Sequence, residues 1–246
     1  MVRGGYPRGS GRCARKPDRM TADAASAEIK VLVFDLDGTL VPTMEDYADH
    51  AAQLMEEAFG TPFVQARRSY FATSGLPFER QLRQLYPGQE TDSVAERFEA
   101  WKDGYLSGIA ISPAVANLLE GWRNEGLLVA ISSNNLEVYV ERLAQDWPVD
   151  CAFGYRAACE GDPGFAKGEA HFAALEKRFG ISRSAFLFTG DSPNDAQIAA
   201  AAGVRFRALL TDAFCADDFE KAVSGTRTIS SLAEIGGIFA TVMANG

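Results

Sequence analysis

The stretch that decides the fold is residues 29–39, which read IKVLVFDLDGT. Its first six residues are apolar apart from Lys30 and rich in β-branched side chains, a pattern typical of a strand buried on both faces of a parallel sheet. The strand ends at two aspartates, Asp35 and Asp37. Because alternate residues of an extended chain point the same way, both carboxylates are expected to face one spot at the sheet edge. The alternative is a plain Asp-Gly turn with both acids solvated.

Further segments repeat the strand pattern, and helical segments lie between them. Strands are expected at residues 127–131, 185–189 and 204–209, with a weaker candidate at 149–155. Helices are expected at residues 113–124, 136–146 and 168–179. Strands that alternate with helices predict an α/β fold, in which a parallel sheet is joined by right-handed crossovers.

One long helical stretch breaks this alternation. Residues 43–108 show helical patterning and no good strand, with helices expected at 45–59, 78–86 and 91–105. The stretch leaves the carboxyl end of the first strand, which is the end where open α/β sheets bind ligands. We therefore predict a core domain formed by residues 29–42 and 109–246, and a helical cap domain formed by residues 43–108 that covers the site.

Residues 1–28 are predicted to lie outside the folded core. The first 20 residues carry six basic residues and one acidic residue, and they lack the apolar region of a signal peptide. We favour a disordered basic tail, or a misplaced start with Met20 as the first residue. An Arg-rich organelle transit peptide is the weaker alternative.

Composition excludes several classes of function. The 246 residues have a net charge of −9, so the basic face that nucleic-acid binding requires is not expected. No apolar run approaches the roughly 18 residues of a membrane span. The four cysteines form no CxxC pair and no cluster with histidine, which predicts free thiols in a reducing compartment. We therefore expect a cytoplasmic protein, monomeric or weakly dimeric, without nucleic-acid or membrane partners.

Later polar residues follow the predicted strands in a specific order. They are Ser132, Ser133 and Asn134 after the second strand, Lys167 at a helix start, and Asp191 and Asp195 after a further strand. Together with the first two aspartates, they resemble the four motifs of the haloacid dehalogenase-like hydrolase superfamily, over about residues 29–240. The insert lies where this family carries its helical C1 cap. The resemblance implies a Rossmann-like, three-layer parallel sheet core with a small inserted helical cap domain.

The resemblance also implies a role for each acid at the predicted site. Asp35 would attack phosphorus and form an aspartyl-phosphate, which splits one hard step into two. Asp37 would protonate the leaving alkoxide and then activate water. The implied ligands of a Mg²⁺ ion are Asp35, the main-chain carbonyl of Asp37, and Asp191.

The remaining residues are implied to bind the phosphoryl group or to support the site. Ser133 and Asn134 match the family's hydroxyl-asparagine pair, and Lys167 would supply a positive charge. Ser132 is the alternative to Ser133, because the end of a predicted strand is uncertain by one or two residues. Asp195 has three open roles: it could cap the following helix, hold Lys167, or reach the metal through water.

The second aspartate also selects the chemistry. Dehalogenases that resemble this chain lack an acid at Asp37, so its presence favours phosphate monoester hydrolysis or phosphomutase chemistry. Residues 190–195, GDSPND, resemble the phosphoglycolate phosphatase and beta-phosphoglucomutase-like group. We predict a Mg²⁺-dependent phosphatase of small phosphorylated metabolites, similar to phosphoglycolate phosphatase. A phosphomutase is the first alternative, and a non-catalytic binding or scaffold protein is the second.

One departure from the family pattern concerns the hinge of the cap. Family members with a C1 cap often carry Asp-Ser shortly after the first motif, whereas this chain has Val41-Pro42-Thr43. We expect this difference to affect the hinge geometry and not the chemistry of the core.

Overall fold

The core is a six-stranded parallel sheet with the strand order β3-β2-β1-β4-β5-β6. The computed structural model describes residues 28–159 and 164–243, so all but the last residue of the predicted tail 1–28 lies outside the described residues. The strands are β1 (Val31–Phe34), β2 (Leu128–Leu136), β3 (Cys151–Tyr155), β4 (Phe186–Gly190), β5 (Arg205–Leu209) and β6 (Thr228–Ile229). The predicted α/β core is confirmed. The strand β6 was not predicted, because two residues leave no readable pattern.

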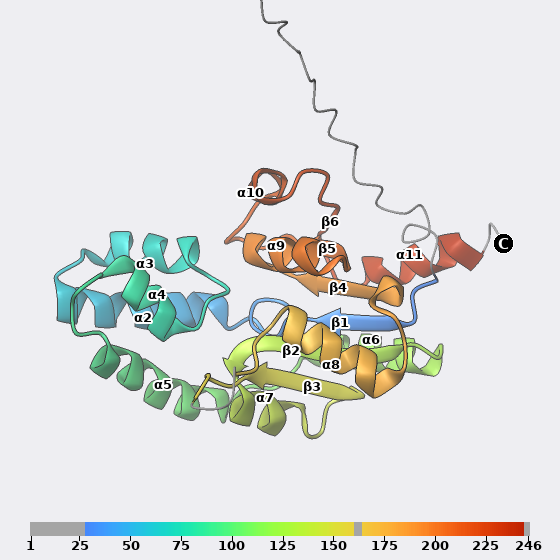
Figure 1. The fold of residues 1–246 in the computed structure, drawn as a ribbon, viewed down its shortest axis with the longest axis horizontal. Helices are drawn as coiled ribbons and strands as arrows, with labels where there is room; N and C mark the ends of the chain where they lie inside the picture. Colours follow the sequence, from blue (N-terminus) through green and yellow to red (C-terminus); the bar gives the residue numbers. More distant parts are fainter. Residues whose placement is uncertain (1–27, 160–163, 244–246) are drawn as a thin grey trace, which may run out of the picture.

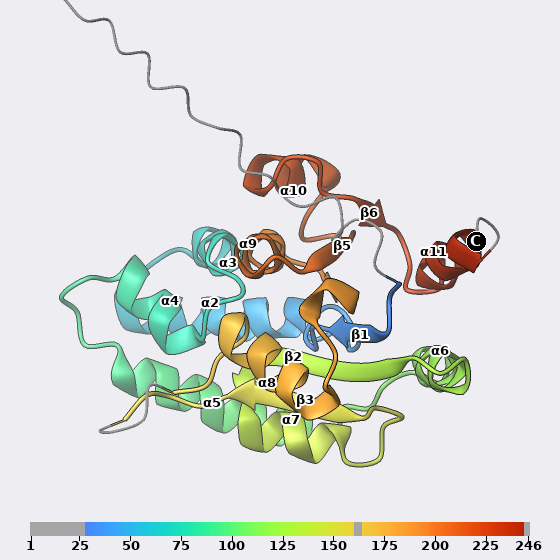
Figure 2. The same ribbon diagram turned by 45° about the vertical axis from the view of Figure 1, so that its right-hand side comes forward.

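Alternating side chains of β1 divide the core into two apolar layers. Leu32 and Phe34 face a layer with α6 (Pro113–Asn124), α7 (Glu137–Ala144) and α11 (Glu234–Met243), and Phe34 stacks on Trp122 with ring centroids 5.5 Å apart. Val31 and Val33 face a layer with α8 (Glu169–Phe179) and α9 (Pro193–Ala202). Helices therefore cover both faces of the sheet, which gives the predicted three-layer arrangement (Figures 1 and 2).

The described residues form two further short helices. They are the 3₁₀ helix η1 (Arg183–Ala185), which precedes β4, and α10 (Ala216–Ala222), which packs beside α9. Within the described residues, no helix is long and apolar enough to cross a membrane.

Before α6 leads the chain back to the sheet at β2, four other helices follow β1. They are α2 (Met44–Phe59), α3 (Phe63–Ala72), α4 (Phe78–Leu85) and α5 (Asp92–Leu106). These cap helices lie together beyond the carboxyl ends of the strands (Figure 1). Aromatic side chains pack between them, and the rings of Phe78 and Phe98 have centroids 4.2 Å apart. The sequence analysis missed α3, whose residues bury only Ala66 and Tyr70 and so leave a weak periodic pattern.

Two predicted boundaries near the site differ in the structure. The strand β2 continues beyond the predicted end at residue 131, because Ser132 and Leu136 still pair with β3 across an irregular register. The helix α8 begins at Glu169, two residues after Lys167, and Gly168 is its N-cap with φ 115°. Lys167 therefore lies in the loop before the helix and does not open it.

Candidate active site

The carboxyl ends of the central strands and the cap helices enclose a cavity of about 420 Å³. The chain enters it from β1 at Asp35, whose main-chain N–H donates to the carbonyl of Thr189 on β4 at 2.9 Å. The neighbouring strand β4 leads to Asp191 on the same edge of the sheet. Six of the seven predicted site residues line this cavity: Asp35, Asp37, Ser133, Asn134, Lys167 and Asp191.

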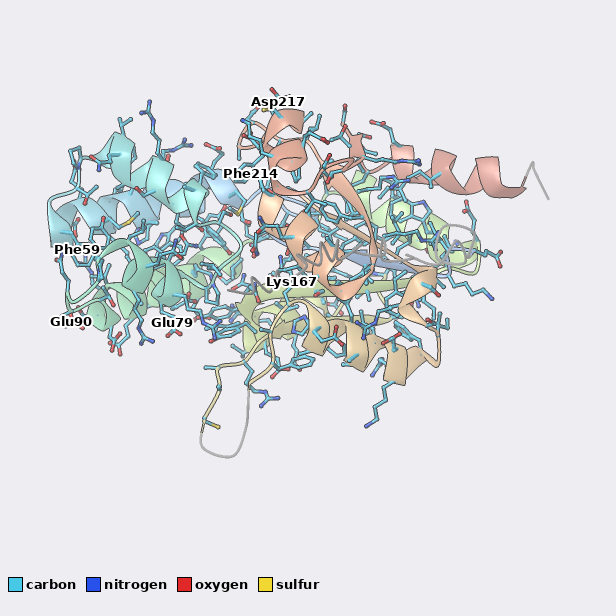
Figure 3. All side chains as sticks on the ribbon, turned by 45° about the horizontal axis from the view of Figure 1, so that its top comes forward. Phe59, Glu79, Glu90, Lys167, Phe214 and Asp217 are labelled. Atoms are coloured by element: carbon cyan, nitrogen blue, oxygen red, sulfur yellow. The ribbon has the colours of Figure 1, made fainter. Side chains whose placement is uncertain are left out.

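Lys167 is the buried cation at the centre of the site, where the cap helices meet the sheet (Figure 3). Its Nζ lies 2.7 Å from Asp35 Oδ1 and 2.8 Å from Asp195 Oδ1. Burial lowers the pKa of Lys167, but the two carboxylates outweigh burial and raise it above its usual value. Burial raises the pKa of Asp35 to about 7 although Lys167 opposes this shift. The ammonium therefore stays charged and fixes the Asp35 side chain.

Asp195 lies behind the cavity and is fully buried. Its Oδ2 accepts hydrogen bonds from the Ser192 hydroxyl at 2.7 Å and the Ser192 N–H at 3.2 Å, which completes a capping box at the start of α9. Its Oδ1 binds Lys167. The structure thus shows two of the three roles left open by the sequence, capping the helix and holding the lysine.

Asp37 is held by residues from two separate parts of the chain. The hydroxyl of Thr43, just before α2, donates to Asp37 Oδ1 at 2.7 Å. The side-chain amide of Asn135 donates to Asp37 Oδ2 at 3.2 Å, and the same nitrogen lies 3.4 Å from the hydroxyl of Tyr47. Thr43 is part of the Val41-Pro42-Thr43 segment that replaces the Asp-Ser often found in the family. This segment therefore supplies a contact to Asp37. Sequence reasoning missed Asn135. Two asparagines follow Ser133, and only the first of them, Asn134, matches the hydroxyl-asparagine pair of the family.

The two adjacent serines of β2 point to opposite sides. Ser133 lines the cavity and its hydroxyl oxygen accepts the N–H of Asn135 at 3.0 Å. Ser132 is fully buried behind the strand, with its Oγ 2.9 Å from Nδ1 of His171. The geometry therefore favours Ser133 over Ser132 as the residue that meets a ligand.

Asn134 connects the cap helices to the loop of Lys167. Its Nδ2 donates to the carbonyl of Gly75 at 2.6 Å, and its Oδ1 accepts the N–H of Lys167 at 3.1 Å. Gly75, with φ 90°, packs against Asn194, and a side chain there would collide with that amide. This contact places the loop between α3 and α4 over the cavity.

The buried side chain of His171, beneath the site, is expected to make the free energy of unfolding depend on pH. Its Nε2 lies 3.2 Å from the carbonyl of Gly154, and burial, with the charge of Lys167, lowers the pKa of His171 to about 3. Its unfolded-state pKa is about 6.5, so the unfolded chain gains a proton first as pH falls. From pH 7 to pH 5, this group is expected to remove about 2 kcal/mol from the free energy of unfolding.

Denaturant unfolding at several pH values measures that loss. The variant His171→Gln, which does not titrate, is expected to lose this part of the slope even if its stability at pH 7 is lower. A wild-type slope identical to that of His171→Gln would contradict a neutral buried imidazole.

The acidic residues around Asp35 form a set of oxygen atoms that suits a hard divalent cation. Carboxylate oxygens of Asp35, Asp191 and Asp195 lie within 4.8 Å of one another, and all three residues are buried. Burial and the neighbouring carboxylates raise the pKa of Asp191 well above its usual value. Gly38, with φ 80°, brings the turn so close that a side chain there would overlap the Asp191 carboxylate. The charge of one lysine does not balance three carboxylates, so a Mg²⁺-type ion fits this cluster.

The capped α/β sheet with an acidic centre at its carboxyl edge has the arrangement of an enzyme active site, and comparison with known proteins gives the family. The model of the haloacid dehalogenase-like hydrolases matches residues 29–203. The chain therefore belongs to the haloacid dehalogenase-like hydrolase family, as the motifs predicted. The predicted enzyme class, a phosphatase, is also confirmed, and a non-catalytic scaffold protein is not supported.

Individual relatives agree with this family. The chain is 28% identical over 191 residues to phosphoglycolate phosphatase 1 of Pseudomonas aeruginosa, covering 73% of this chain and 69% of the relative. Among solved structures, a candidate haloacid dehalogenase-like hydrolase from Bacteroides fragilis superposes with a TM-score of 0.68 at 22% identity, covering 85% of this chain and all of the other. A candidate beta-phosphoglucomutase from Bacteroides vulgatus superposes with a TM-score of 0.64 at 18% identity, covering 89% and 90%. These superpositions confirm the predicted fold.

Proposed function

We propose that this protein is a Mg²⁺-dependent phosphatase of small phosphorylated metabolites, similar to phosphoglycolate phosphatase, which acts in the cytoplasm without nucleic-acid or membrane partners. The observation that carries the proposal is the convergence of Asp35, Asp37, Lys167 and Asp191 on one cavity. A phosphate monoester gives the protein little covalent chemistry to do, so positioning and charge neutralisation dominate its hydrolysis. The cavity supplies both through its carboxylates and its buried lysine.

Asp35 is the proposed nucleophile. Lys167 holds its Oδ1 at 2.7 Å, so the other carboxylate oxygen is left to attack phosphorus. The new O–P bond forms as the bond from phosphorus to the leaving oxygen breaks, which gives an aspartyl-phosphate and an alkoxide. Lys167 and Ser133 bind the phosphoryl oxygens during this transfer.

Asp37 is the proposed general acid and base. In its protonated form it donates a proton to the leaving alkoxide, and as the carboxylate it then takes a proton from water. That water attacks phosphorus, breaks the bond to Asp35 and releases inorganic phosphate. The bonds from Thr43 and Asn135 fix both Asp37 oxygens, so the acid stays oriented between the two steps.

The acidic cluster is the proposed magnesium site. The proposed ligands are Asp35, Asp191 and the main-chain carbonyl of Asp37, as the family resemblance implies, and Asp195 is held by Lys167 and Ser192 beside them. When bound, the ion neutralises negative charge that the carboxylates would otherwise present to the phosphoryl group.

Phosphate release from an aryl phosphate in the presence of Mg²⁺ tests this function. A panel of phosphorylated metabolites, including 2-phosphoglycolate, then ranks the substrates by kcat/KM. We expect inorganic phosphate to form in every productive reaction. Interconversion of sugar phosphates that needs a bisphosphate and releases no phosphate would instead establish a phosphomutase.

We propose that residues 43–108 move as one cap domain and close over the cavity when a ligand binds. Closure would exclude water until the phosphoryl group is transferred. The contacts between Asn134 and Gly75 and between the rings of Phe71 and Phe214 join this segment to the core. We expect a beryllium fluoride complex, added with Mg²⁺ and the alcohol product, to favour the closed form.

Distances between spectroscopic labels measure this closure. Cysteines placed at Val64 in the cap and at Glu120 in the core, both exposed, carry the labels after Cys13, Cys159 and Cys215 are replaced by serine. With the mimic, we expect the mean distance between these labels to shorten or its distribution to narrow. The distance between a control pair of labels in the core, at Glu120 and Val138, is expected to stay constant. If the ligand-free protein is open and the distance does not change when the mimic binds, the cap is a fixed lid.

A further inference from the structure

Lys102 is a buried cation on the cap side of the cavity. It lies on α5, lines the cavity, and is only 6% exposed. Three aromatic rings surround its ammonium group, with centroids at 5.2 Å for Tyr47, 5.6 Å for Phe98 and 5.9 Å for Tyr139. Aromatic faces attract a cation but accept no strong hydrogen bond, so they leave the donors of the ammonium largely unused.

The charge of Lys102 is incompletely paired. The oxygens of Glu99, one turn earlier on α5, lie 3.4 Å from its Nζ, beyond the roughly 2.7–2.9 Å of a strong charge-assisted hydrogen bond. Within residues 28–159 and 164–243, no second oxygen partner of Lys102 is found. An ammonium group has three donors, and burying it is costly unless these are satisfied. This arrangement fits a ligand that brings the missing acceptor.

Tyr70 presents a second donor to the same cavity. It lies on α3, is 5% exposed and lines the cavity, and its hydroxyl makes no hydrogen bond to the part of the chain that the structure describes. Burial raises its pKa well above the usual value, and the charges of Asp37, Glu99 and Asp191 add to the effect. The hydroxyl therefore stays protonated and close to the acidic centre.

Tyr47 lies between Lys102 and the residues that hold Asp37. Its ring lies against Lys102, and its hydroxyl lies 3.4 Å from the Asn135 nitrogen that donates to Asp37. The ammonium and Asp37 are thus separated by one tyrosine and one asparagine side chain. In a cavity of about 420 Å³, this arrangement leaves room for a phosphoryl group and a short leaving group between them.

Apart from Glu99, the other charged groups of the cap that line the cavity lie at its rim. Glu79 is partly exposed and Arg83, Asp92 and Glu96 are exposed, and Arg83 is paired with Asp92 at 3.2 Å. Water screens such groups and weakens their attraction for a ligand. Among the described residues of the cap helices, Lys102 is therefore the cation that a bound leaving group meets away from solvent.

We propose that Lys102 and Tyr70 form a subsite for a carboxylate on the leaving group of the substrate. This inference rests on the proposed phosphatase function and identifies the residues that select its substrate. The carboxylate accepts from the free donors of Lys102 and from the Tyr70 hydroxyl. A neutral leaving group leaves the ammonium underpaired, and an amine is repelled by it. Lys102 then lies between two carboxylates, those of Glu99 and of the ligand, as Lys167 lies between Asp35 and Asp195.

Three phosphate monoesters that differ only at the far end of a two-carbon leaving group test the subsite. They are 2-phosphoglycolate with a carboxylate, 2-hydroxyethyl phosphate with a hydroxyl, and O-phosphoethanolamine with an amine. The readout is the ratio of kcat/KM for the carboxylate ester to kcat/KM for the hydroxyl ester. We expect the full-length wild-type protein with Mg²⁺ to favour the carboxylate ester.

The variant Lys102→Met keeps the length of the side chain and removes its charge. We expect it to lower this selectivity ratio about 10- to 100-fold, the value of a lost hydrogen bond between charged groups. The variant Lys102→Arg retains the charge and is expected to retain part of the preference. Tyr70→Phe is expected to lower the ratio about 3- to 10-fold.

The matched control is Arg97→Met, which removes a cation from the same helix. Arg97 is exposed and pairs with Glu57 away from the cavity at 2.7 Å, so the ratio is expected to stay within about twofold of wild type. Circular dichroism and thermal unfolding confirm that each variant is folded. If Lys102→Met does not fold, Tyr70→Phe and Lys102→Arg decide the proposal.

The possible outcomes separate this inference from the function on which it rests. Absence of phosphate release from every ester, including an aryl phosphate, overturns the phosphatase function itself. Phosphate release with a ratio that Lys102→Met and Tyr70→Phe leave unchanged overturns the subsite alone. A wild-type preference for the amine ester that disappears in Glu99→Gln would establish a cation subsite instead.

Discussion

Replacing Asp35 by asparagine is expected to abolish phosphate release and to leave the fold intact. An amide is a far weaker nucleophile than a carboxylate, so no aspartyl-phosphate forms, and we expect kcat to fall by more than about 10³-fold. Asparagine is nearly isosteric with aspartate, and its introduction removes one of three clustered carboxylates. Lys167 keeps its ion pair with Asp195, so the midpoint of thermal unfolding is expected to stay the same or to rise.

Single-turnover and steady-state phosphate release by purified Asp35→Asn measure this effect, with circular dichroism to confirm folding. A matched control is Asp217→Asn, which makes the same change at an exposed position of α10 (Figure 3). The control is expected to keep wild-type kinetics. Near wild-type turnover by folded Asp35→Asn, with contaminating phosphatases excluded, would refute its role as nucleophile.

Removal of Mg²⁺ by a chelator is expected to abolish activity and to leave the secondary structure unchanged. The proposed ligands Asp35 and Asp191 present carboxylates that lie too close together to meet an anionic phosphoryl group without a cation. The core itself is apolar, with Leu32, Phe34 and Phe188 almost fully buried on the two faces of the sheet. We therefore expect folding not to depend on the ion.

Phosphate release is measured in excess chelator and again after Mg²⁺ is restored, and far-ultraviolet circular dichroism is recorded in both states. Asp191→Asn removes one proposed ligand, so we expect it to need a higher Mg²⁺ concentration for half-maximal activity. Asp212→Asn, outside the cavity, serves as the control. Full activity in excess chelator would contradict the metal assignment, and loss of the helical signal would contradict a purely catalytic role.

Features that depend on neighbouring residues in the chain were predictable. Residues 29–34 are almost wholly apolar because β1 is buried on both faces, and the switch to Asp35 marks the point where the chain reaches the open edge of the sheet. Asp191 follows β4 in the same manner. The Ser-Pro-Asn-Asp pattern of residues 192–195 predicted the observed capping box, since capping is a contact within one turn of helix.

The sequence could not show which side chains from distant segments meet. Asn135 and Asp37 are 98 residues apart in the chain, and Tyr47 and Asn135 are 88 apart, so neither pairing leaves a local signal. The direction of Ser132 and Ser133 also depends on where β2 ends, and an error of one residue reverses the face to which each points.

The sequence alone determined the α/β core, the family and the acids at the ends of β1 and β4, because strand burial and motif spacing are local properties of the chain. The tertiary structure alone decided what surrounds those acids. In the sequence, Lys102 is one charged residue in a helical segment, indistinguishable from a solvated lysine. Its burial arises because α5 packs its side against Tyr47 of α2 and Tyr139 of α7, residues 55 positions before and 37 positions after it. Burial and pairing depend on the packing of such distant segments, and no local pattern encodes them.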